Sequence, residues 1–220
     1  MPTIEYCAPW PPQRLTKLQL ELECIAVEHG KLLVRIPCAN PDDIPRVLVT
    51  HHGDIYRSYF RHDLPQRVLQ ELEMLAPQQA FEDPETVRRL LSLDRPCADH
   101  VTFQSYVFPQ TLSQDLYPDA VRLPELNTIG GPVFGMVIDG QVVSACTSVR
   151  ENARCAEAWV WTLPAFQRRG YARQVTSAWA HDLQLQSKLP FYSHKVSNLA
   201  SAAVAWSLAL VHFATATAYA

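Results

Sequence analysis

The feature that most constrains the fold is the order of apolar runs and helical segments from Val133 to the end of the chain. Two apolar runs flank Asp139-Gly140, a pair that tolerates positive φ in a tight turn, so a β-hairpin is expected over 133–149. A strand at 155–162 and a helix at about 171–186 follow, and then a strand, a helix and a strand complete the chain. This β-β-β-α-β-α-β order predicts an α/β (α+β) fold, with a mixed central sheet flanked by helices.

Residues 1–130 have a less regular pattern, because prolines interrupt most of their segments. A strand, a turn at Gly53 and a second strand are expected over 46–62, followed by two short helices near 66–75 and 84–93. The region between residues 96 and 132 predicts one short strand around 102–108 and a connecting loop. We therefore expect two domains: a less regular α/β portion over 1–130 and a second domain over 131–220.

Composition excludes several classes of function. The net charge is −3, so no overall positive field attracts the chain to nucleic acid. The six cysteines are scattered and form no C-x-x-C pair, which favours reduced thiols in a cytoplasmic protein. The start of the chain lacks the charge pattern of a secretory leader. The uncharged stretch 199–220 has the length of a membrane span, but its period changes from helical to alternating, so a helix and a strand are expected and no membrane partner.

The stretch Gln167-Arg168-Arg169-Gly170 lies between an apolar strand and an amphipathic helix. The first amide groups of a helix have no partner inside the helix and attract anions, above all phosphates. Gly170 would let such an anion approach the backbone, and the side chains before it would add donors and positive charge. The alternative is a plain helix start with exposed arginines. The stretch is neither a Walker loop nor a dinucleotide fingerprint.

With its flanking strand and helix, "VWTLPAFQRRGYA" resembles the acyl-CoA pyrophosphate loop of the GNAT N-acetyltransferase superfamily, whose signature is [QR]-x-x-G-x-[GA]. Gln167, Gly170 and Ala172 match its fixed positions. The later "PFYSHKVSNLASAAVAWSLALV" is similar to the superfamily's next strand and helix. Asn198 matches the Asn that opens this helix, and Leu208-Ala209-Leu210 matches its ending except for alanine in place of glycine. The resemblance covers about 133–220.

The resemblance implies a cofactor site for acetyl-CoA. It implies that the strand before the loop diverges from its neighbour and pairs with the pantetheine arm. It also implies that amides of the loop hold the pyrophosphate and that the helix-opening Asn contacts the cofactor near its thioester. The cofactor-binding residues expected on this basis are Val160, Trp161, Thr162, Gln167, Arg168, Arg169, Gly170, Tyr171, Ala172 and Asn198.

The catalytic groups are less clear from the sequence. Many members of the superfamily carry a Tyr as general acid seven residues after the Asn, where this chain has Ala205. Glu157 is a charged residue in an apolar strand, so it is a candidate general base or an edge residue. His194 titrates near neutral pH and is a second candidate base or a structural residue. No metal is expected, since His51-His52 has no further ligand at helical spacing.

The function implied is N-acyl transfer from acetyl-CoA to a primary amine of a small molecule or amino acid, by direct attack on the thioester. The missing Tyr leaves an alternative open, a non-catalytic acyl-CoA-binding regulatory module. Residues 1–130 are expected to shape the acceptor site. Homodimers are common in the superfamily, and the uncharged final strand could pair with a second copy.

Overall fold

The structure is a computed structural model, which describes residues 10–23, 25–28, 31–34, 44–97, 99–110, 112, 116–128 and 131–220. The chain divides into two compact units. Unit 1 contains Met1–Leu22 and Tyr106–His212, and unit 2 contains Glu23–Ser105 and Phe213–Ala220. Unit 1 therefore includes the start of the chain and unit 2 includes its end, whereas the sequence predicted one boundary near residue 130.

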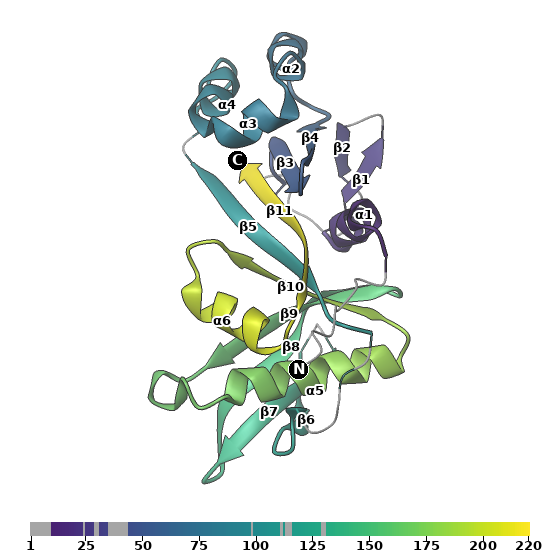
Figure 1. The fold of residues 1–220 in the computed structure, drawn as a ribbon, viewed down its shortest axis with the longest axis vertical. Helices are drawn as coiled ribbons and strands as arrows, with labels where there is room; N and C mark the ends of the chain where they lie inside the picture. The colour runs from purple at the N-terminus through teal and green to yellow at the C-terminus, as the bar shows by residue number, and fades with distance from the viewer. Residues whose placement is uncertain are drawn as a thin grey trace. The chain divides into compact units, whose positions relative to one another are not determined.

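Unit 1 is built on a mixed sheet, which confirms the expected fold class. Its strands follow the order β10-β9-β8-β7-β6, with β9 and β10 parallel and the other neighbours antiparallel. The expected hairpin around Asp139-Gly140 joins β7 to β8. Helices α5 and α6 lie beside this sheet (Figure 1), and α1 contacts β9. The elements are α1 (Pro12–Leu22), β6 (Val121–Thr128), β7 (Gly131–Ile138), β8 (Gln141–Glu151), β9 (Cys155–Thr162), α5 (Tyr171–Leu185), β10 (Leu189–Lys195) and α6 (Leu199–Ser207).

Helix α5 covers one face of this sheet and closes the core of unit 1. Its apolar side packs against alternate residues of β7, β8 and β9, such as Cys146 and Ala156, which are fully buried. Trp179 lies at the centre of the interface, and its Nε1 donates to Ser148 Oγ at 3.1 Å. Burial raises the pKa of the Cys146 thiol, so this residue acts as a small hydrophobe. The strand that precedes the loop is therefore fixed against the helix that follows it.

Unit 2 contains the strand order β1-β2-β4-β3-β11-β5 and three short helices. The last strand of the chain, β11, lies between β3 and β5. Its residues Thr215–Tyr219 pair antiparallel with β3. The elements are β1 (Ile25–Glu28), β2 (Lys31–Val34), β3 (Val47–His52), β4 (Ile55–Arg61), α2 (Gln66–Glu73), α3 (Pro77–Glu82), α4 (Pro84–Leu91), β5 (His100–Val107) and β11 (Val211–Tyr219).

Some expectations from the sequence fall on residues that the structure does not describe. The start of the chain, residues 1–9, and the thiols of Cys7, Cys24 and Cys38 lie outside the described residues. The three cysteines that are described, Cys97, Cys146 and Cys155, are free. Within the described ranges, no helix is both long and apolar enough to cross a bilayer. Residues 199–219 form α6 and β11, the helix and strand that the sequence predicts there.

Candidate functional site

Strands β9 and β10 form a fork. Their parallel pairing begins at Cys155 and Leu189 and ends where Glu157 pairs with Phe191. Beyond this point, residues 158–162 of β9 stay paired with β8 but not with β10. The unpaired stretch contains Val160, Trp161 and Thr162, the residues expected to face the pantetheine arm. Backbone groups at such an opening are available to an extended ligand.

A loop joins the open end of β9 to α5. A short 3₁₀ helix, Pro164–Phe166, fills its first half. Gly170 is the last residue before α5 and has a φ of +81°, in the left-handed region that glycine tolerates best. A Cβ built on Gly170 would have no atom within 4 Å. The backbone here therefore faces open space, as an anion-binding loop requires.

The amide groups at this helix start have no hydrogen-bond partner among the described residues. The first bonded amide is that of Gln174, which donates to the Gly170 carbonyl at 3.1 Å. In the fully described segment 131–220, no hydrogen bond engages the amides of residues 168–173. The Gln167 amide donates to the Pro164 carbonyl at 3.4 Å. The unbonded amides thus include that of Arg173, which is not among the expected cofactor-binding residues. They do not include that of Gln167, which is among them.

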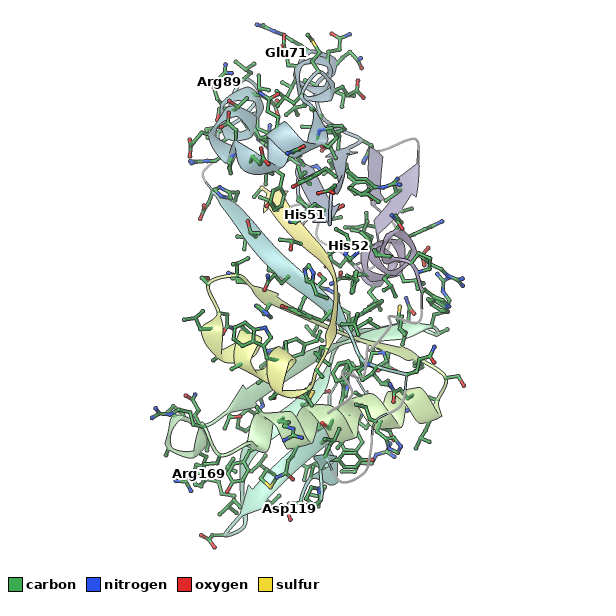
Figure 2. All side chains as sticks on the ribbon, in the orientation of Figure 1. His51, His52, Glu71, Arg89, Asp119 and Arg169 are labelled. Atoms are coloured by element: carbon green, nitrogen blue, oxygen red, sulfur yellow. The ribbon has the colours of Figure 1, made fainter. Side chains whose placement is uncertain are left out.

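Two side chains of this loop donate hydrogen bonds to nearby backbone carbonyls. Gln167 Nε2 donates to the Thr162 carbonyl at 3.3 Å, so the side chain ties the loop to the end of β9. Arg169 donates to the Ala165 carbonyl at 3.2 Å, and its guanidinium lies 5.2 Å from the centre of the Phe166 ring. Figure 2 shows Arg169 at the loop that precedes α5. Arg168 is exposed and has a φ of +60°.

The loop combines the features of an anion site. The unbonded amides at the start of α5 lie at the positive end of the helix dipole, which favours negative charge there. The first turn of α5 contains no acidic residue. Arg168, Arg169 and Arg173 add positive charge beside the same amides. This arrangement suits a phosphate or pyrophosphate group.

Glu157 lies at the closed end of the fork and is only 3% exposed. Its Oε2 accepts from Arg150 at 2.9 Å, and its Oε1 accepts from Ser193 Oγ and, at 3.4 Å, from Gln19 Nε2. Arg150 comes from β8, Ser193 from β10 and Gln19 from α1. A buried carboxylate thus stands at the point where β9 and β10 part, and hydrogen bonds from three elements fix its orientation.

His194 is 5% exposed and lies on β10, beyond the last paired residue. Its Nδ1 lies 2.9 Å from the Lys195 carbonyl, so Nδ1 carries the proton in this contact. Its Nε2 is buried without a hydrogen-bond partner among the described residues. The ring stacks on Tyr106, with 5.5 Å between centroids. Nε2 can therefore accept or carry a proton.

The two catalytic candidates lie on opposite faces of the sheet. Paired residues of neighbouring strands share a face, and successive residues alternate. Glu157 pairs with Phe191, so both point away from α5, together with Ser193. Tyr192 and His194 point to the other face, where Tyr192 packs in the core with α5 and α6. A shared proton relay between Glu157 and His194 is therefore excluded by this geometry.

The remaining predicted position, Asn198, acts as a helix cap. Its Oδ1 accepts from the Ser201 amide at 3.1 Å at the start of α6. Ala205, one turn after Ser201, is fully buried and offers no hydroxyl. The phenol of Tyr192 donates to the Ser201 carbonyl at 3.3 Å. Burial raises the pKa of Tyr192 to about 12.

Two tryptophans of this part of the chain are exposed. Trp179 is buried, but Trp159 is 53% exposed and Trp206 is 77% exposed. Alternation along β9 places Trp159 on the face of Glu157, which α5 does not cover. The pair His51-His52 ends β3 as expected. Across the described ranges, no three His, Cys, Asp or Glu side chains gather as metal ligands would.

Residues 129–219 match the family model of the GNAT acetyltransferases. Curated proteins include no match to the chain. Among solved structures, a protein assigned to the GNAT family from Novosphingobium aromaticivorans is 16% identical with a TM-score of 0.47, over 56% of this chain and 65% of that one. The chain thus spans just under two thirds of that protein.

Two further structures cover more of both chains. A GNAT-family acetyltransferase from Colwellia psychrerythraea is 16% identical with a TM-score of 0.49, over 89% of this chain and 79% of that one. An N-acetyltransferase-like protein from Streptococcus suis is 15% identical with a TM-score of 0.46, over 83% and 87%. The family match coincides with the fork, the loop and helices α5 and α6. Residues 129–219, the C-terminal part of the chain, are therefore similar to the GNAT acetyltransferases.

Proposed function

We propose that the chain transfers an acetyl group from acetyl-CoA to a primary amine of a small molecule or amino acid, in the cytoplasm. The observation that carries this proposal is the row of unbonded amides at residues 168–173 beside the open end of β9. These amides would hold the pyrophosphate of CoA. The unpaired edge at Val160, Trp161 and Thr162 would then bind the pantetheine arm, with the thioester toward the closed end of the fork. Asn198, whose oxygen caps α6, would contact the cofactor through its amide nitrogen.

The reaction needs one bond exchange and two proton movements. The amine nitrogen bonds to the thioester carbon, the carbon–sulfur bond breaks, and the sulfur leaves as a thiolate. Glu157, at the closed end of the fork, accepts the proton that the nitrogen loses. On the other face, an imidazolium at His194 would give the thiolate its proton from Nε2. After the products leave, Glu157 gives up one proton and His194 takes one, which restores both groups. The products are an amide and the free thiol of CoA.

The alternative function, a regulatory module that binds acyl-CoA without turnover, rests on Ala205. No side-chain hydroxyl reaches the fork from that position of α6. Glu157 and His194 favour the enzyme, because a buried carboxylate and an unpartnered imidazole flank the fork. Tight binding of acetyl-CoA with no thiol release across a wide set of amines would support the module instead.

Substitution of Gly170 by valine tests the loop. A side chain at φ +81° strains the backbone, and its methyl groups would occupy the space above the free amides. We expect the affinity for acetyl-CoA to fall about 100-fold, which corresponds to about 2.7 kcal/mol. Isothermal titration calorimetry on the full chain measures this change.

Gly140 provides a matched control for that substitution. It has a φ of +76° and, like Gly170, no atom within 4 Å of a built Cβ, but it lies in the β7–β8 turn. Gly140→Val should therefore cost similar backbone strain and leave the affinity for acetyl-CoA unchanged. Equal affinities in wild type and Gly170→Val would refute the loop assignment.

A further inference from the structure

An amine cannot reach the carboxylate of Glu157 in the arrangement that the structure shows. Glu157 is only 3% exposed, and both of its carboxylate oxygens accept hydrogen bonds. A general base must come within about 3 Å of the atom whose proton it takes, or act through one water molecule. One of the groups that surround Glu157 must therefore move before this carboxylate can act as a base.

Burial along this face of β9 follows helix α1. Cys155, Glu157 and Trp159 point to the same face, because side chains alternate along a strand. Their exposed fraction rises along the row, from 0% to 3% and then to 53%. The Cys155 thiol donates to the Leu18 carbonyl of α1 at 3.7 Å, and Gln19 of the same helix donates to Glu157. Helix α1 therefore covers the closed end of the fork and leaves about half of Trp159 exposed.

Helix α1 is attached differently from the other two groups at Glu157. Arg150 belongs to β8, which pairs with β9, and Ser193 belongs to β10, which pairs with β9 as far as Phe191. Helix α1 belongs to the first segment of unit 1, and the chain leaves this unit after Leu22. Among the residues that the structure describes, no backbone hydrogen bond joins α1 to β9. Helix α1 can therefore withdraw without breaking the sheet.

Side chains hold α1 against the sheet. Leu15, Leu18 and Leu22 lie on one side of the helix and are buried, so the covered state is the stable one. Near the end of the helix, Glu21 forms an ion pair with Arg154, the residue before β9. The Arg154 side chain is 60% exposed, so this pair is weak and sensitive to salt. It is thus a contact of α1 that can be removed with little effect on the core.

Withdrawal of α1 would free an acceptor position on Glu157. Its Oε1 accepts from two donors, Ser193 and Gln19, and a carboxylate oxygen has two such positions. The bond from Gln19 is the longer of the two, at 3.4 Å. When Gln19 leaves with α1, Oε1 can accept from the N–H of an amine, while Arg150 and Ser193 still orient the carboxylate.

We propose that α1 is a movable cover of the fork, which opens to let the amine reach Glu157 and otherwise keeps this carboxylate buried. The inference rests on the proposed acetyl transfer and concerns the access of the acceptor to the same site. Such an opening is a local event, with a smaller free energy than unfolding of the whole unit. Because the Cys155 thiol lies under the same helix, it becomes accessible in the same step.

Alkylation of Cys155 by iodoacetamide measures the opening, with peptide mass spectrometry on the full chain to give the rate at each cysteine. Glu21→Gln removes the ion pair with Arg154 and should favour the open state. An exposed pair of this kind changes an equilibrium about two- to fivefold, so we expect the alkylation rate of Cys155 to rise by that factor. Cys146 is the internal control, because it is equally buried but packs against α5, and its rate should not change.

The same variant should raise kcat/KM for the amine about two- to fivefold, because the fraction of open molecules limits the encounter. The KM for acetyl-CoA should stay unchanged, since α1 does not contribute to the loop before α5. Thiol release from acetyl-CoA measures both, with butylamine, 2-phenylethylamine and phenylalanine as the amines. Glu85→Gln is the matched control, because it removes an exposed ion pair with Arg88 in unit 2 and should change neither constant.

The two readouts distinguish the cover from the proposed function. An unchanged alkylation rate of Cys155 in Glu21→Gln would overturn the cover and leave the acetyl transfer in place. Faster alkylation with an unchanged or lower kcat/KM would also overturn the cover, because α1 would then support Glu157 rather than hide it. No thiol release with any of the three amines, in wild type and variant alike, would overturn the proposed function and with it the role of α1.

Discussion

Glu157→Gln is expected to lower kcat for amine acetylation at least about 100-fold and to leave the affinity for acetyl-CoA unchanged. A positioned general base contributes about 10² to 10⁴ to the rate, and the amide of Gln cannot accept the proton. Gln can keep the bonds to Ser193 and Gln19, so the shape of the fork should persist. Thiol release under saturating acetyl-CoA measures kcat, and calorimetry measures the affinity.

Two further variants separate the loss of the base from the loss of its ion pair and test the group on the opposite face. Arg150→Gln removes the same ion pair but retains the carboxylate, so its kcat should stay within about threefold of wild type. His194→Gln reports on the opposite face, and a loss of about tenfold there would show a proton role for Nε2. The assignment of Glu157 as base fails if Arg150→Gln and Glu157→Gln lose activity equally, because the ion pair would then explain both.

The part of the fold that the sequence predicts well is the part with strong local signals. The hairpin at Asp139-Gly140 follows from turn chemistry alone, and Gly140 has the positive φ that such a turn requires. The start of α5 follows from Gly170 in the same way. Asp83, which stands before Pro84, caps α4 with its side chain bonded to the Thr86 amide. These signals act over a few residues, so one sequence suffices to read them.

Other expectations failed where tertiary contacts decide the structure. Asp63 precedes α2 but does not cap it, because its carboxylate pairs with Arg61. Strands β1, β2 and β6 and helices α1 and α3 escaped prediction; β6 contains a proline, and α1 and α3 begin at one. Nothing local indicates that residues 213–219 return to unit 2, where the end of β11 pairs with β3. A single boundary near residue 130 therefore could not describe the two units.

The candidate site shows the same limit. The loop could be read from its residues, but the bond between Glu157 and Gln19 joins positions 138 residues apart. Alternation along β9 could have placed Trp159 on the same face as Glu157. Its exposure could not be foreseen, because it depends on which helix covers which face of the sheet. The sequence thus predicts the donor side of the fork better than the acceptor side.

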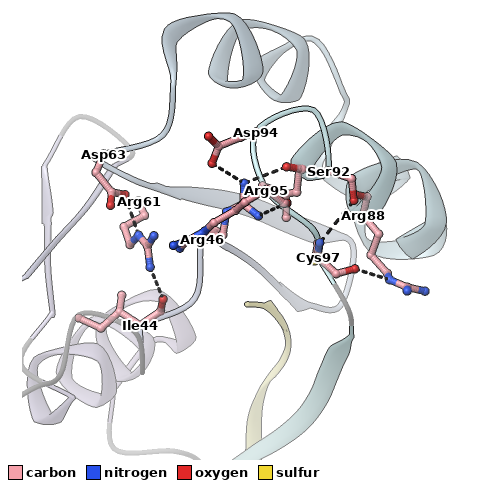
Figure 3. A network of polar contacts seen from close by, with 10 residues as sticks. Ile44, Arg46, Arg61, Asp63, Arg88, Ser92, Asp94, Arg95 and Cys97 are labelled. Carbon is pink, nitrogen blue, oxygen red and sulfur yellow. Dashed lines mark hydrogen bonds and ion pairs between the residues drawn. The ribbon is translucent and has the colours of Figure 1, made fainter.

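In unit 2, a buried arginine supports the end of a helix. Arg46 is fully buried, and its guanidinium donates to the Leu91 carbonyl at 2.9 Å, the Arg95 carbonyl at 3.0 Å and Asp94 Oδ2 at 2.9 Å (Figure 3). Leu91 is the last residue of α4, so its carbonyl has no partner within the helix. The positive charge also suits the negative end of the helix dipole. Burial lowers the pKa of Arg46, and Asp94 opposes this shift.

Arg46→Met should therefore destabilise unit 2 by about 3–5 kcal/mol. Methionine fills a similar volume, but it removes the donor to Asp94 Oδ2 and to the Arg95 carbonyl, whereas the Leu91 carbonyl keeps its bonds from the amides of Asp94 and Arg95. An unpaired buried polar group costs about 1–3 kcal/mol. Denaturant unfolding followed by circular dichroism, with hydrogen exchange to localise the loss to α4, measures the change. Arg89→Met is the control on the same helix, since Arg89 is exposed and its loss should cost less than about 0.5 kcal/mol. Equal stability of the two variants would mean that the desolvation cost of the Arg46 guanidinium cancels its three hydrogen bonds, so that the buried charge adds no net stability to unit 2.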